Sequence, residues 1–419
     1  MGRAGTRPWQ LCPHDRRAPH RLRSRRPAKR EARRKAWPTG GTARPDTPFC
    51  RQPESVRMTP TIPLPNAHAR DAARSALLSA HGWRDDHAAP LAGDASARRY
   101  LRLTAPGRTA VLMDADPAAG EDVRPFIAIT ASLRARGLSA PDILGSDLDA
   151  GFLLLEDLGD DLFARVCTRD ASAEPALYAA AVDLLAAMHR DMPATPTEAA
   201  TIGPYDMAVL VHEAALVPDW LLPASTGAAT PADLRGEYLS LVAAACAPVA
   251  VADAAQPGAA LVLRDYHAEN LIWLPDRVGH ARVGLLDHQD ALIGRPAYDL
   301  ASLLEDARRD TSADLRAAMM TRYADAAGLD AVGRDALATE FAILAAQRNL
   351  KILGIFTRLC IRDGKPGYVD LLPRVWAHLQ RDLAHPALAG LRAFVAAHVP
   401  APDAAMRARL KSLTARTAS

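Results

Sequence analysis

The sequence contains few cysteines and few aromatic residues. Only 5 of its 419 residues are Cys, and Phe, Trp and Tyr together make up 5%. Cys12 and Cys50 lie near the N-terminus, whereas Cys167, Cys246 and Cys360 are far apart, and no CxxC pair occurs. This odd, unpatterned set argues against a disulfide framework and a cysteine metal site, and it predicts reduced thiols in the cytoplasm.

Long hydrophobic runs are also missing. An α-helix needs ~20 mostly apolar residues to cross a bilayer, and no run in the sequence approaches that length. The apolar content of 49% is nevertheless ample for a core. We therefore expect a soluble protein without a membrane partner. The chain of 419 residues is longer than a single typical domain.

The net charge of +3 hides an uneven distribution. Residues 1–57 hold 16 Lys and Arg against 4 Asp and Glu, so they carry +12 and the remainder carries −9. Such a segment is typical of a nucleic-acid arm or a transit peptide. However, residues 21–35 show no apolar periodicity, and Met58 resembles an ordinary start. We expect 1–57 to be a disordered basic extension from a mis-assigned start codon, with no nucleic-acid partner.

Hydrophobic periodicity after Met58 predicts both helices and strands. The expected helices cover 67–81 and 122–136, and the expected strands lie at 100–103, at 110–113 and within 141–158. From Pro175 onward, Ala and Leu recur at helical spacing, so the second half is expected to be mostly helical. The pattern predicts an α+β protein without internal repeats.

The segment from Leu261 to Asp287 alternates apolar runs with oxygen-bearing side chains. Apolar runs at 261–263, 271–274 and 283–286 are followed or separated by Asp265, Asn270 and Asp287, and a polar turn occupies 275–279. Two strands joined by that turn would form a hairpin. The three oxygen-bearing side chains are then expected at one edge of it.

These residue types suit phosphoryl transfer. A carboxylate such as Asp265 can orient or deprotonate an acceptor hydroxyl, and an amide plus a carboxylate, here Asn270 and Asp287, can hold Mg²⁺ while phosphates supply further ligands. An isolated Asp-x4-Asn is equally typical of a capped turn with a solvated Asp. The hairpin and the second terminal Asp favour the functional interpretation.

Arg264-Asp265, Asn270, Asp287 and the later Gly294-x3-Tyr298-Asp299-Leu300 resemble the catalytic loop and metal segment of the aminoglycoside phosphotransferase and choline kinase group. The resemblance implies a protein-kinase-like fold of two lobes. Residues 58–157 would form a small, nucleotide-binding N-lobe with an antiparallel sheet, and 158–419 a larger, mostly helical C-lobe with the catalytic loop and the acceptor-binding helices.

Further blocks resemble the sugar 1-kinases that phosphorylate N-acetylmuramate and N-acetylglucosamine at the anomeric hydroxyl during cell-wall recycling. These blocks lie at 93–100, 151–159, 264–267, 290–291 and 353–359. The resemblance extends from about Arg70 to about Leu388. It implies ATP as co-substrate, Mg²⁺, an amino-sugar acceptor and a cytoplasmic monomer. Arg264 and Asp299 would support the catalytic loop, although Asp299 could equally cap the helix expected at 300–308.

The nucleotide site departs from the kinase pattern. Kinase-like folds carry a Lys on the third strand of the N-lobe, whereas 110–114 has none, as in the sugar-kinase subgroup. Ser96 and Arg98, or Arg99 or Arg102, are then candidates for binding phosphates, with a solvated strand face as an equal alternative for the arginines. By resemblance, the backbone of Glu156 and Leu158 would meet adenine. Leu263 also replaces the usual His, which concerns loop packing more than chemistry.

Acceptor recognition is expected from the helical lobe. His267 could contact the sugar, and Glu213 could bind its hydroxyls. Trp220 or Phe356 could stack on the sugar, and Arg348 or Arg358 could pair with a muramate carboxylate. Taken one at a time, the residues of these helices are better explained by a core or solvated position, and only the whole set favours acceptor binding. Three alternatives remain for the whole protein. It could be a kinase of an aminoglycoside, choline or homoserine, or a catalytically inactive kinase-like binding protein. From the basic segment 1–57 alone, it could also be a nucleic-acid binder.

Overall fold

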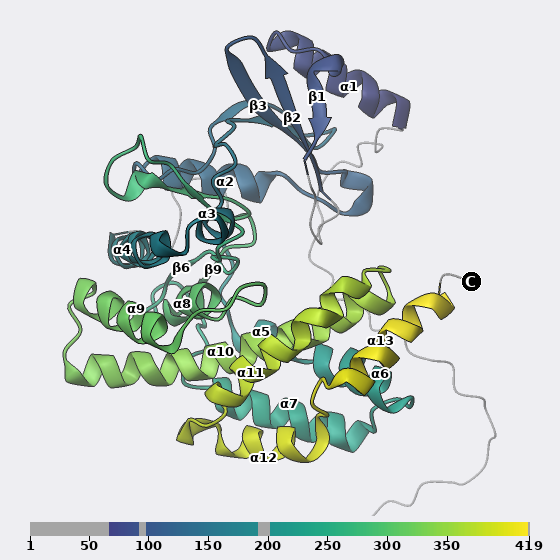
Figure 1. The fold of residues 1–419 in the computed structure, drawn as a ribbon, viewed down its shortest axis with the longest axis vertical. Coiled ribbons are helices and arrows are strands. Elements are labelled where there is room, and N and C mark those ends of the chain that lie inside the picture. Colours follow the sequence, from purple (N-terminus) through teal and green to yellow (C-terminus); the bar gives the residue numbers. More distant parts are fainter. Residues whose placement is uncertain (1–66, 92–97, 192–201, 418–419) are drawn as a thin grey trace, which may run out of the picture. The chain divides into compact units, whose positions relative to one another are not determined.

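The computed structural model describes residues 67–91, 98–191 and 202–417 (Figure 1). The extension 1–57 and Ser96 lie outside the described residues, and the predictions for them remain predictions. The predicted domain limits likewise remain predictions.

The N-terminal part is built on a five-stranded antiparallel sheet. Its strand order is β1 (Ala88–Pro90), β2 (Arg99–Ala105), β3 (Arg108–Asp114), β5 (Phe152–Leu155) and β4 (Ile143–Asp147). Two helices accompany the sheet, α1 (Ala67–Ala80) and α2 (Arg124–Arg134) (Figure 1). The expected antiparallel N-lobe is confirmed, and β1 is a strand that the sequence pattern did not predict.

Hydrophobic side chains cover both faces of this sheet. Because residues two apart on a strand share a face, Leu112 and Leu154 pack on one side with Leu78 of α1, and Met113 and Phe126 pack on the other. Strand β5 is buried along its whole length. Burial on two faces explains why its sequence is a continuous apolar run and not an alternating one.

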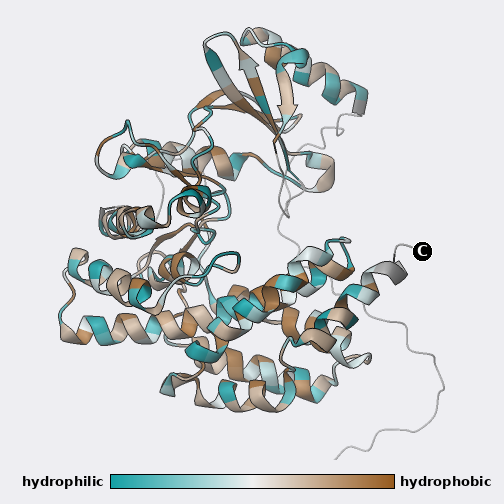
Figure 2. Cartoon of the chain, viewed as in Figure 1, coloured by the Kyte–Doolittle hydropathy of each residue, from teal (hydrophilic) through white to brown (hydrophobic). Residues whose placement is uncertain are grey.

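The C-terminal part is mostly helical. Its helices are α3 (Phe163–Arg169), α4 (Glu174–Asp191), α5 (Met207–Ala214), α6 (Leu222–Thr226), α7 (Ala232–Cys246), α8 (Ala297–Leu304), α9 (Ala313–Ala326), α10 (Ala331–Ile361), α11 (Leu372–Asp382), α12 (Ala389–His398) and α13 (Ala404–Thr417), with a π-helical segment η4 (Val217–Leu221). Two short antiparallel pairs complete it, β6 (Ala260–Val262) with β9 (Leu292–Gly294) and β7 (Leu271–Trp273) with β8 (Val283–Leu285). Most helices carry hydrophobic and hydrophilic residues side by side (Figure 2), as expected of helices packed on one side.

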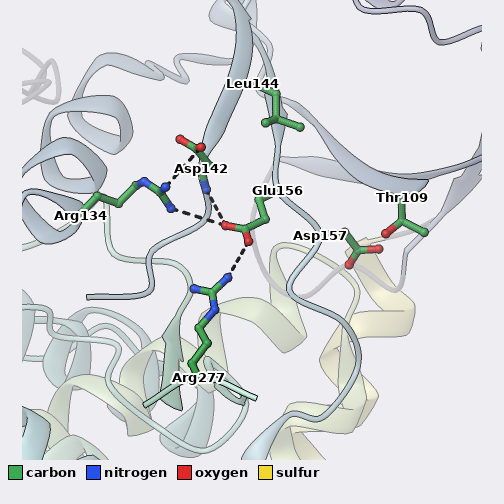
Figure 3. A pocket seen from close by; sticks show the side chains of 7 residues that line it. All are labelled: Thr109, Arg134, Asp142, Leu144, Glu156, Asp157 and Arg277. Carbon is green, nitrogen blue, oxygen red and sulfur yellow. Dashed lines mark hydrogen bonds and ion pairs between the residues drawn. The ribbon is translucent and has the colours of Figure 1, made fainter. Parts of the chain in front are cut away.

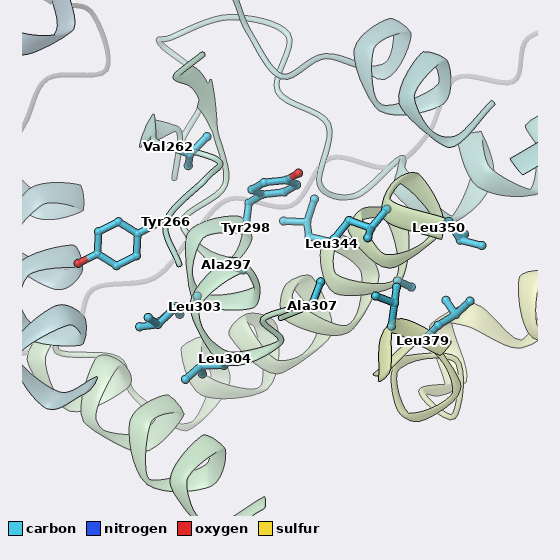
Figure 4. Close-up of a cluster of buried hydrophobic side chains, with 14 of the residues drawn as sticks. Val262, Tyr266, Ala297, Tyr298, Leu303, Leu304, Ala307, Leu344, Leu350 and Leu379 are labelled. Atoms are coloured by element: carbon cyan, nitrogen blue, oxygen red, sulfur yellow. The ribbon is translucent and has the colours of Figure 1, made fainter. Parts of the chain in front are cut away.

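Helix α10 is the longest described helix, with 31 residues. Leu344 and Leu350 on α10 pack in one buried cluster with Leu379 of α11 and with α8 (Figure 4). At Gly354 the helix approaches Leu216 so closely that an added Cβ would lie 2.4 Å from the Leu216 Cβ and 2.6 Å from its carbonyl carbon. Glycine is needed there for the two backbones to meet.

One helical stretch corrects the expectation about apolar runs. Among the described residues, Met207–Thr226 is the one helical stretch that is long and apolar enough to span a membrane. Half of its most apolar 18 residues are buried inside the protein. It consists of α5, η4 and α6 in succession and contains two prolines, Pro218 and Pro223. Buried core helices commonly have this composition.

Candidate active site

The hairpin predicted from the sequence is present and brings the candidate residues to one end. Strand β7 pairs with β8, Leu271 facing Leu285. The Leu286 N–H donates to the Asn270 carbonyl at 3.0 Å, which places Asp287 beside Asn270. The Asn270 Nδ2 in turn donates to the Asp265 carbonyl at 3.0 Å. The predicted catalytic loop, residues 263–270 between β6 and β7, is therefore closed onto the hairpin end.

Two residues of this region adopt a left-handed backbone. Arg264 has φ 69° and Asp287 has φ 54°, and among the described residues they are the non-glycine positions with positive φ. For a residue with a Cβ, this backbone conformation is unfavourable in free energy, and it persists only where surrounding contacts enforce it. The strain falls on the residue before Asp265 and on Asp287 itself.

Asp299 supplies one of those contacts. Its fully buried carboxylate accepts the backbone N–H groups of Leu263 and Arg264, both at 2.8 Å. Asp299 lies within the first turn of α8, whose N-cap is Pro296. The helix begins earlier than predicted, and the carboxylate binds the catalytic loop instead of capping its own helix.

Asn270 and Asp287 form a donor set that fits Mg²⁺. The Asn270 Nδ2 is bound to the loop, which leaves its Oδ1 as an acceptor. Burial raises the pKa of Asp287, and the neighbouring charge of Asp265 raises it further, so a cation at this position would be stabilised. Hard oxygen donors are those that Mg²⁺ prefers, with phosphate oxygens and water as further ligands.

Gln289 stabilises the turn that carries Asp287. Its Nε2 donates to the Asp287 Oδ1 at 2.8 Å and lies 3.4 Å from the Asp290 Oδ2. From the sequence, Gln289 and Asp290 could equally face the metal or acceptor or stabilise the turn, and these contacts favour turn stabilisation. Gln289 thereby fixes the orientation of the Asp287 carboxylate.

A cavity of ≈ 430 Å³ opens at this end of the hairpin. Its apolar lining comes from both parts of the chain, and its polar end contains the candidate metal ligands. The lining includes Tyr100, Val111, Leu155, Leu158, Ile272 and Leu286 together with Arg98, Glu156, Asn270, Asp287 and Arg308. An apolar slot with a few convergent polar groups, of this volume, is typical of a nucleotide-sized ligand.

Glu156 follows β5 at the edge of the cavity and is fixed by ion pairs. Its carboxylate accepts the Arg277 Nη2 at 2.6 Å, the Asp142 N–H at 3.1 Å and the Arg134 Nη1 at 3.5 Å (Figure 3). The Glu156 N–H donates to the Asp142 carbonyl at 2.8 Å. The backbone of the segment after β5 is thus rigidly placed, as the predicted adenine contact at Glu156 and Leu158 requires.

Comparison with known proteins agrees with this arrangement. The sequence profile of the phosphotransferase enzyme family matches residues 87–335, which is more than half of the chain. The chain belongs to this family. It is 39% identical to an N-acetylmuramate/N-acetylglucosamine kinase of Caulobacter vibrioides over 79% of this chain and 97% of that protein. An N-acetylmuramate/N-acetylglucosamine kinase of Pseudomonas aeruginosa is 36% identical over 75% of this chain and 90% of its own length.

A solved structure provides a looser likeness. The GDP complex of wild-type aminoglycoside 2′-phosphotransferase IIIa has 16% sequence identity and a TM-score of 0.48, over 75% of this chain and 98% of that one. The phosphotransferase family membership therefore rests on the sequence matches, and the two-lobed arrangement rests on the sheet and helices described above.

The three arginines considered for phosphate binding in this phosphotransferase lie in different surroundings. Arg98 lines the cavity, and its Nη1 lies 3.6 Å from the Asp287 Oδ1. Arg99 is 73% exposed and pairs with Asp114 at 2.9 Å. Arg102 also lines the cavity, and it is bound to the segment after β5 through Asp157 at 2.9 Å and Asp160 at 2.6 Å.

Glu213, predicted as an acceptor ligand, is placed in a buried ion cluster. Its Oε1 pairs with the Arg264 guanidinium and accepts the Lys351 Nζ at 2.8 Å. Its Oε2 accepts the Tyr205 hydroxyl and the Gln347 Nε2. Burial opposes ionisation, but Lys351 and Arg264 outweigh it and hold the pKa of Glu213 below its usual value. Both oxygens are therefore occupied by the protein, and a direct sugar contact remains only a prediction.

The other predicted acceptor residues are not among those that line the cavity. His267 is buried, with its Nε2 3.5 Å from the Asn270 Nδ2, and burial lowers its pKa so that the ring is neutral near pH 7. Arg348 is buried and donates to the Glu305 carbonyl at 3.3 Å. Trp220 is half-buried on η4. The structure does not bring these three together.

Sequence reasoning missed several residues of the site. Glu121 pairs with Arg98 at 2.8 Å, and Tyr100 and Arg308 line the cavity. Glu121 sits in an ordinary Gly-Glu-Asp turn, and no local pattern indicates its partner 23 residues away. The sequence places Tyr100 on an expected strand and in the block 93–100, and a single aromatic residue on an N-lobe strand is a signal for the wall of a nucleotide slot.

Proposed function

We propose that this protein is an ATP-dependent phosphotransferase that acts on the anomeric hydroxyl of an N-acetylated amino sugar, N-acetylmuramate or N-acetylglucosamine. The observation that carries the proposal is the convergence of Asp265, Asn270 and Asp287 at one hairpin end, where Asn270 and Asp287 line the cavity and Asp265 lies close enough for its charge to act on Asp287. The acceptor is supported by relatives at 36–39% identity that are N-acetylmuramate/N-acetylglucosamine kinases.

The proposed reaction is an in-line transfer. Asp265 accepts a hydrogen bond from the anomeric hydroxyl and takes its proton as the hydroxyl oxygen bonds to the γ-phosphorus of ATP. The bond from that phosphorus to the bridging oxygen breaks, and ADP leaves. Asn270 and Asp287 would hold Mg²⁺, which supplies positive charge beside the phosphate oxygens. The backbone of Glu156 and Leu158 would bind adenine.

Several finer points belong to the same proposal. Arg264 and Asp299 would hold the catalytic loop, and His267, Trp220 and Arg348 remain candidates for sugar recognition. We propose a cytoplasmic monomer, and the buried, unpaired thiols of Cys167, Cys246 and Cys360 support a reducing compartment.

A substrate panel tests the proposal. The purified full chain would be assayed for ATP consumption with N-acetylglucosamine, N-acetylmuramate, kanamycin, choline and homoserine, and the product identified by phosphorus NMR. We expect turnover on one or both amino sugars and a phosphate on the anomeric carbon. Turnover on kanamycin, choline or homoserine alone would replace the acceptor in the proposal.

A second assay addresses an inactive, kinase-like binding protein. Asp287→Ala is expected to abolish the Mg²⁺-dependent part of ATP binding, because it removes the carboxylate ligand. If nucleotide binding in this variant equals that of the wild type, and no acceptor turns over, the binding-protein alternative is the better one.

A further inference from the structure

Strand β3 offers no cation to the cavity. Its residues Val111 and Met113 are apolar and share the face that packs with Phe126. The basic residue of β3, Arg108, is directed to α1 and the turn after it, where its guanidinium lies 4.2 Å from the Trp83 ring centroid and donates to the Gly82 carbonyl. A side-chain cation that binds the phosphates together with Mg²⁺ must therefore come from another element.

Arg98 stands at the polar end of the cavity. It precedes β2, its side chain is 12% exposed, and it borders both the cavity and Asp287. The Arg98 Nε donates to the Glu121 Oε2 at 2.8 Å. Glu121 is 18% exposed and lies between a short 3-10 turn (Pro117–Ala119) and α2. The ion pair is therefore mostly buried and joins two elements that flank the cavity.

The Arg98 contact geometry suits an oriented phosphate ligand. Glu121 binds the Nε edge of the guanidinium, and the Nη1 group extends to within 3.6 Å of the Asp287 Oδ1. A guanidinium is permanently charged and binds two phosphate oxygens through its planar fork. A carboxylate that binds its Nε edge orients the plane of the guanidinium and reduces the conformational entropy lost on phosphate binding.

Arg99 and Arg102, the other two arginines considered for phosphate binding, pair with carboxylates other than Asp287. Arg102 contacts Asp157, Asp160 and the Gly159 carbonyl, so it fixes the segment after β5. Arg99 points to solvent and pairs with Asp114. Neither lies beside Asp287.

We propose that Arg98, oriented by Glu121, binds the phosphates of the nucleotide in place of the lysine that β3 lacks. Glu121 is then a positioning residue that acts through Arg98. The inference rests on the proposed use of ATP and assigns a specific cation and its partner to it.

The test measures affinities of the full chain for ATP, ADP and adenosine by calorimetry. Arg98→Gln should weaken ATP binding by about 10-fold to 100-fold, the range for charge-assisted hydrogen bonds, and leave adenosine binding unchanged within about 2-fold. Arg98→Lys should restore part of the loss. Arg99→Gln, the adjacent exposed arginine, is the matched control and should bind all three ligands like the wild type.

Glu121 is tested through its dependence on Arg98. Glu121→Gln should weaken ATP binding by about 3-fold to 10-fold and raise the KM for ATP without changing the KM for the sugar. In the double variant with Arg98→Gln, the second substitution should add no further loss, because its effect passes through the guanidinium. Glu121→Asp should recover part of the affinity.

The outcomes separate the two proposals. Equal losses for ATP and adenosine, or full ATP affinity in a folded Arg98→Gln variant, would overturn the role of Arg98. Additive losses in the double variant would overturn the role of Glu121. If the wild type neither binds ATP nor turns over any sugar, the proposed function itself fails.

Discussion

Asp265 is the residue on which the proposed chemistry depends most directly. It is half-buried between Arg264, whose backbone is left-handed, and a loop closed by Asn270. The carboxylate position is therefore set by backbone contacts on both sides, and its side chain is not engaged in holding the loop. A substitution of this side chain should affect catalysis more than folding.

We expect Asp265→Asn to lower kcat by about 10²-fold to 10⁴-fold, the usual contribution of a general base. The KM for ATP and the melting temperature should change little, because Asn is isosteric and the loop contacts use the Asp265 backbone. Steady-state kinetics on the best amino sugar measure this. A kcat within a few-fold of the wild type would show that another group takes the proton.

At the scale of elements, Glu213 joins three segments. It lies on α5 and binds Arg264 of the catalytic loop and Lys351 of α10. Its side chain is 10% exposed, and those of Arg264 and Lys351 are 18% and 15% exposed. One carboxylate thus compensates two mostly buried cations.

Glu213→Ala should therefore lower the free energy of unfolding by about 3–5 kcal/mol, because it leaves two buried cations without their counter-charge. Chemical denaturation followed by circular dichroism measures the loss. Adding Lys351→Met should recover part of it, since one uncompensated charge is removed. No recovery in the double variant would show that packing, and not charge, dominates at this position.

The contact between α10 and Leu216 supplies a second prediction at this scale. Gly354→Ala should destabilise the protein by about 1–3 kcal/mol, because the added methyl group would overlap the Leu216 backbone. Gly236 on α7 is exposed, and an added Cβ would meet nothing within 4 Å. Gly236→Ala is the matched control and should stabilise by about 0.5–1 kcal/mol. Equal effects at the two positions would contradict the close approach.

The elements that could be predicted from the sequence are those with local signals. Strand β5 at Phe152–Leu155, α1 and the β7–β8 hairpin lie where the apolar periodicity indicates. The start of α8 was misplaced by a few residues, because Asp299 resembles a helix cap and instead binds a loop 36 residues earlier. Side-chain partners this distant leave no local pattern.

The same division applies to the site. Asp265, Asn270 and Asp287 could be grouped in advance because a hairpin has simple geometry. The pairing of Glu213 with Arg264 spans 51 residues and that of Arg98 with Glu121 spans 23. Such pairs depend on how helices and sheet pack, and the sequence alone contains many equivalent acids and bases.

At the scale of the whole molecule, buried histidines determine part of the acid sensitivity. Burial, and then the charge of the adjacent Arg381, lowers the pKa of His378 to about 4. An unfolded chain binds a proton at this side chain below about pH 6.5, whereas the folded protein does not until about pH 4. The contribution of His378 to stability is therefore complete above pH 6.5 and is lost as the pH falls through this window.

His378→Gln should flatten the decline of stability between pH 6.5 and 4.5, since the titrating group is gone, by up to about 1.4 kcal/mol for each pH unit. Denaturation curves at several pH values measure the slope. His212→Gln, at an exposed position of α5, serves as control. Parallel slopes for wild type and His378→Gln would mean that His378 is accessible to protons in the folded state.

The left-handed backbone at Arg264 and Asp287 has a consequence for protein engineering. Gly or Asn adopts that conformation at lower cost than Arg or Asp. A library that is screened only for heat tolerance should consequently accumulate Gly or Asn at Asp287, whereas Arg264 should be retained because of its mostly buried ion pair with Glu213. The most heat-stable variants would be those that have lost catalytic activity, so a screen of this protein has to measure thermal stability and activity in the same round.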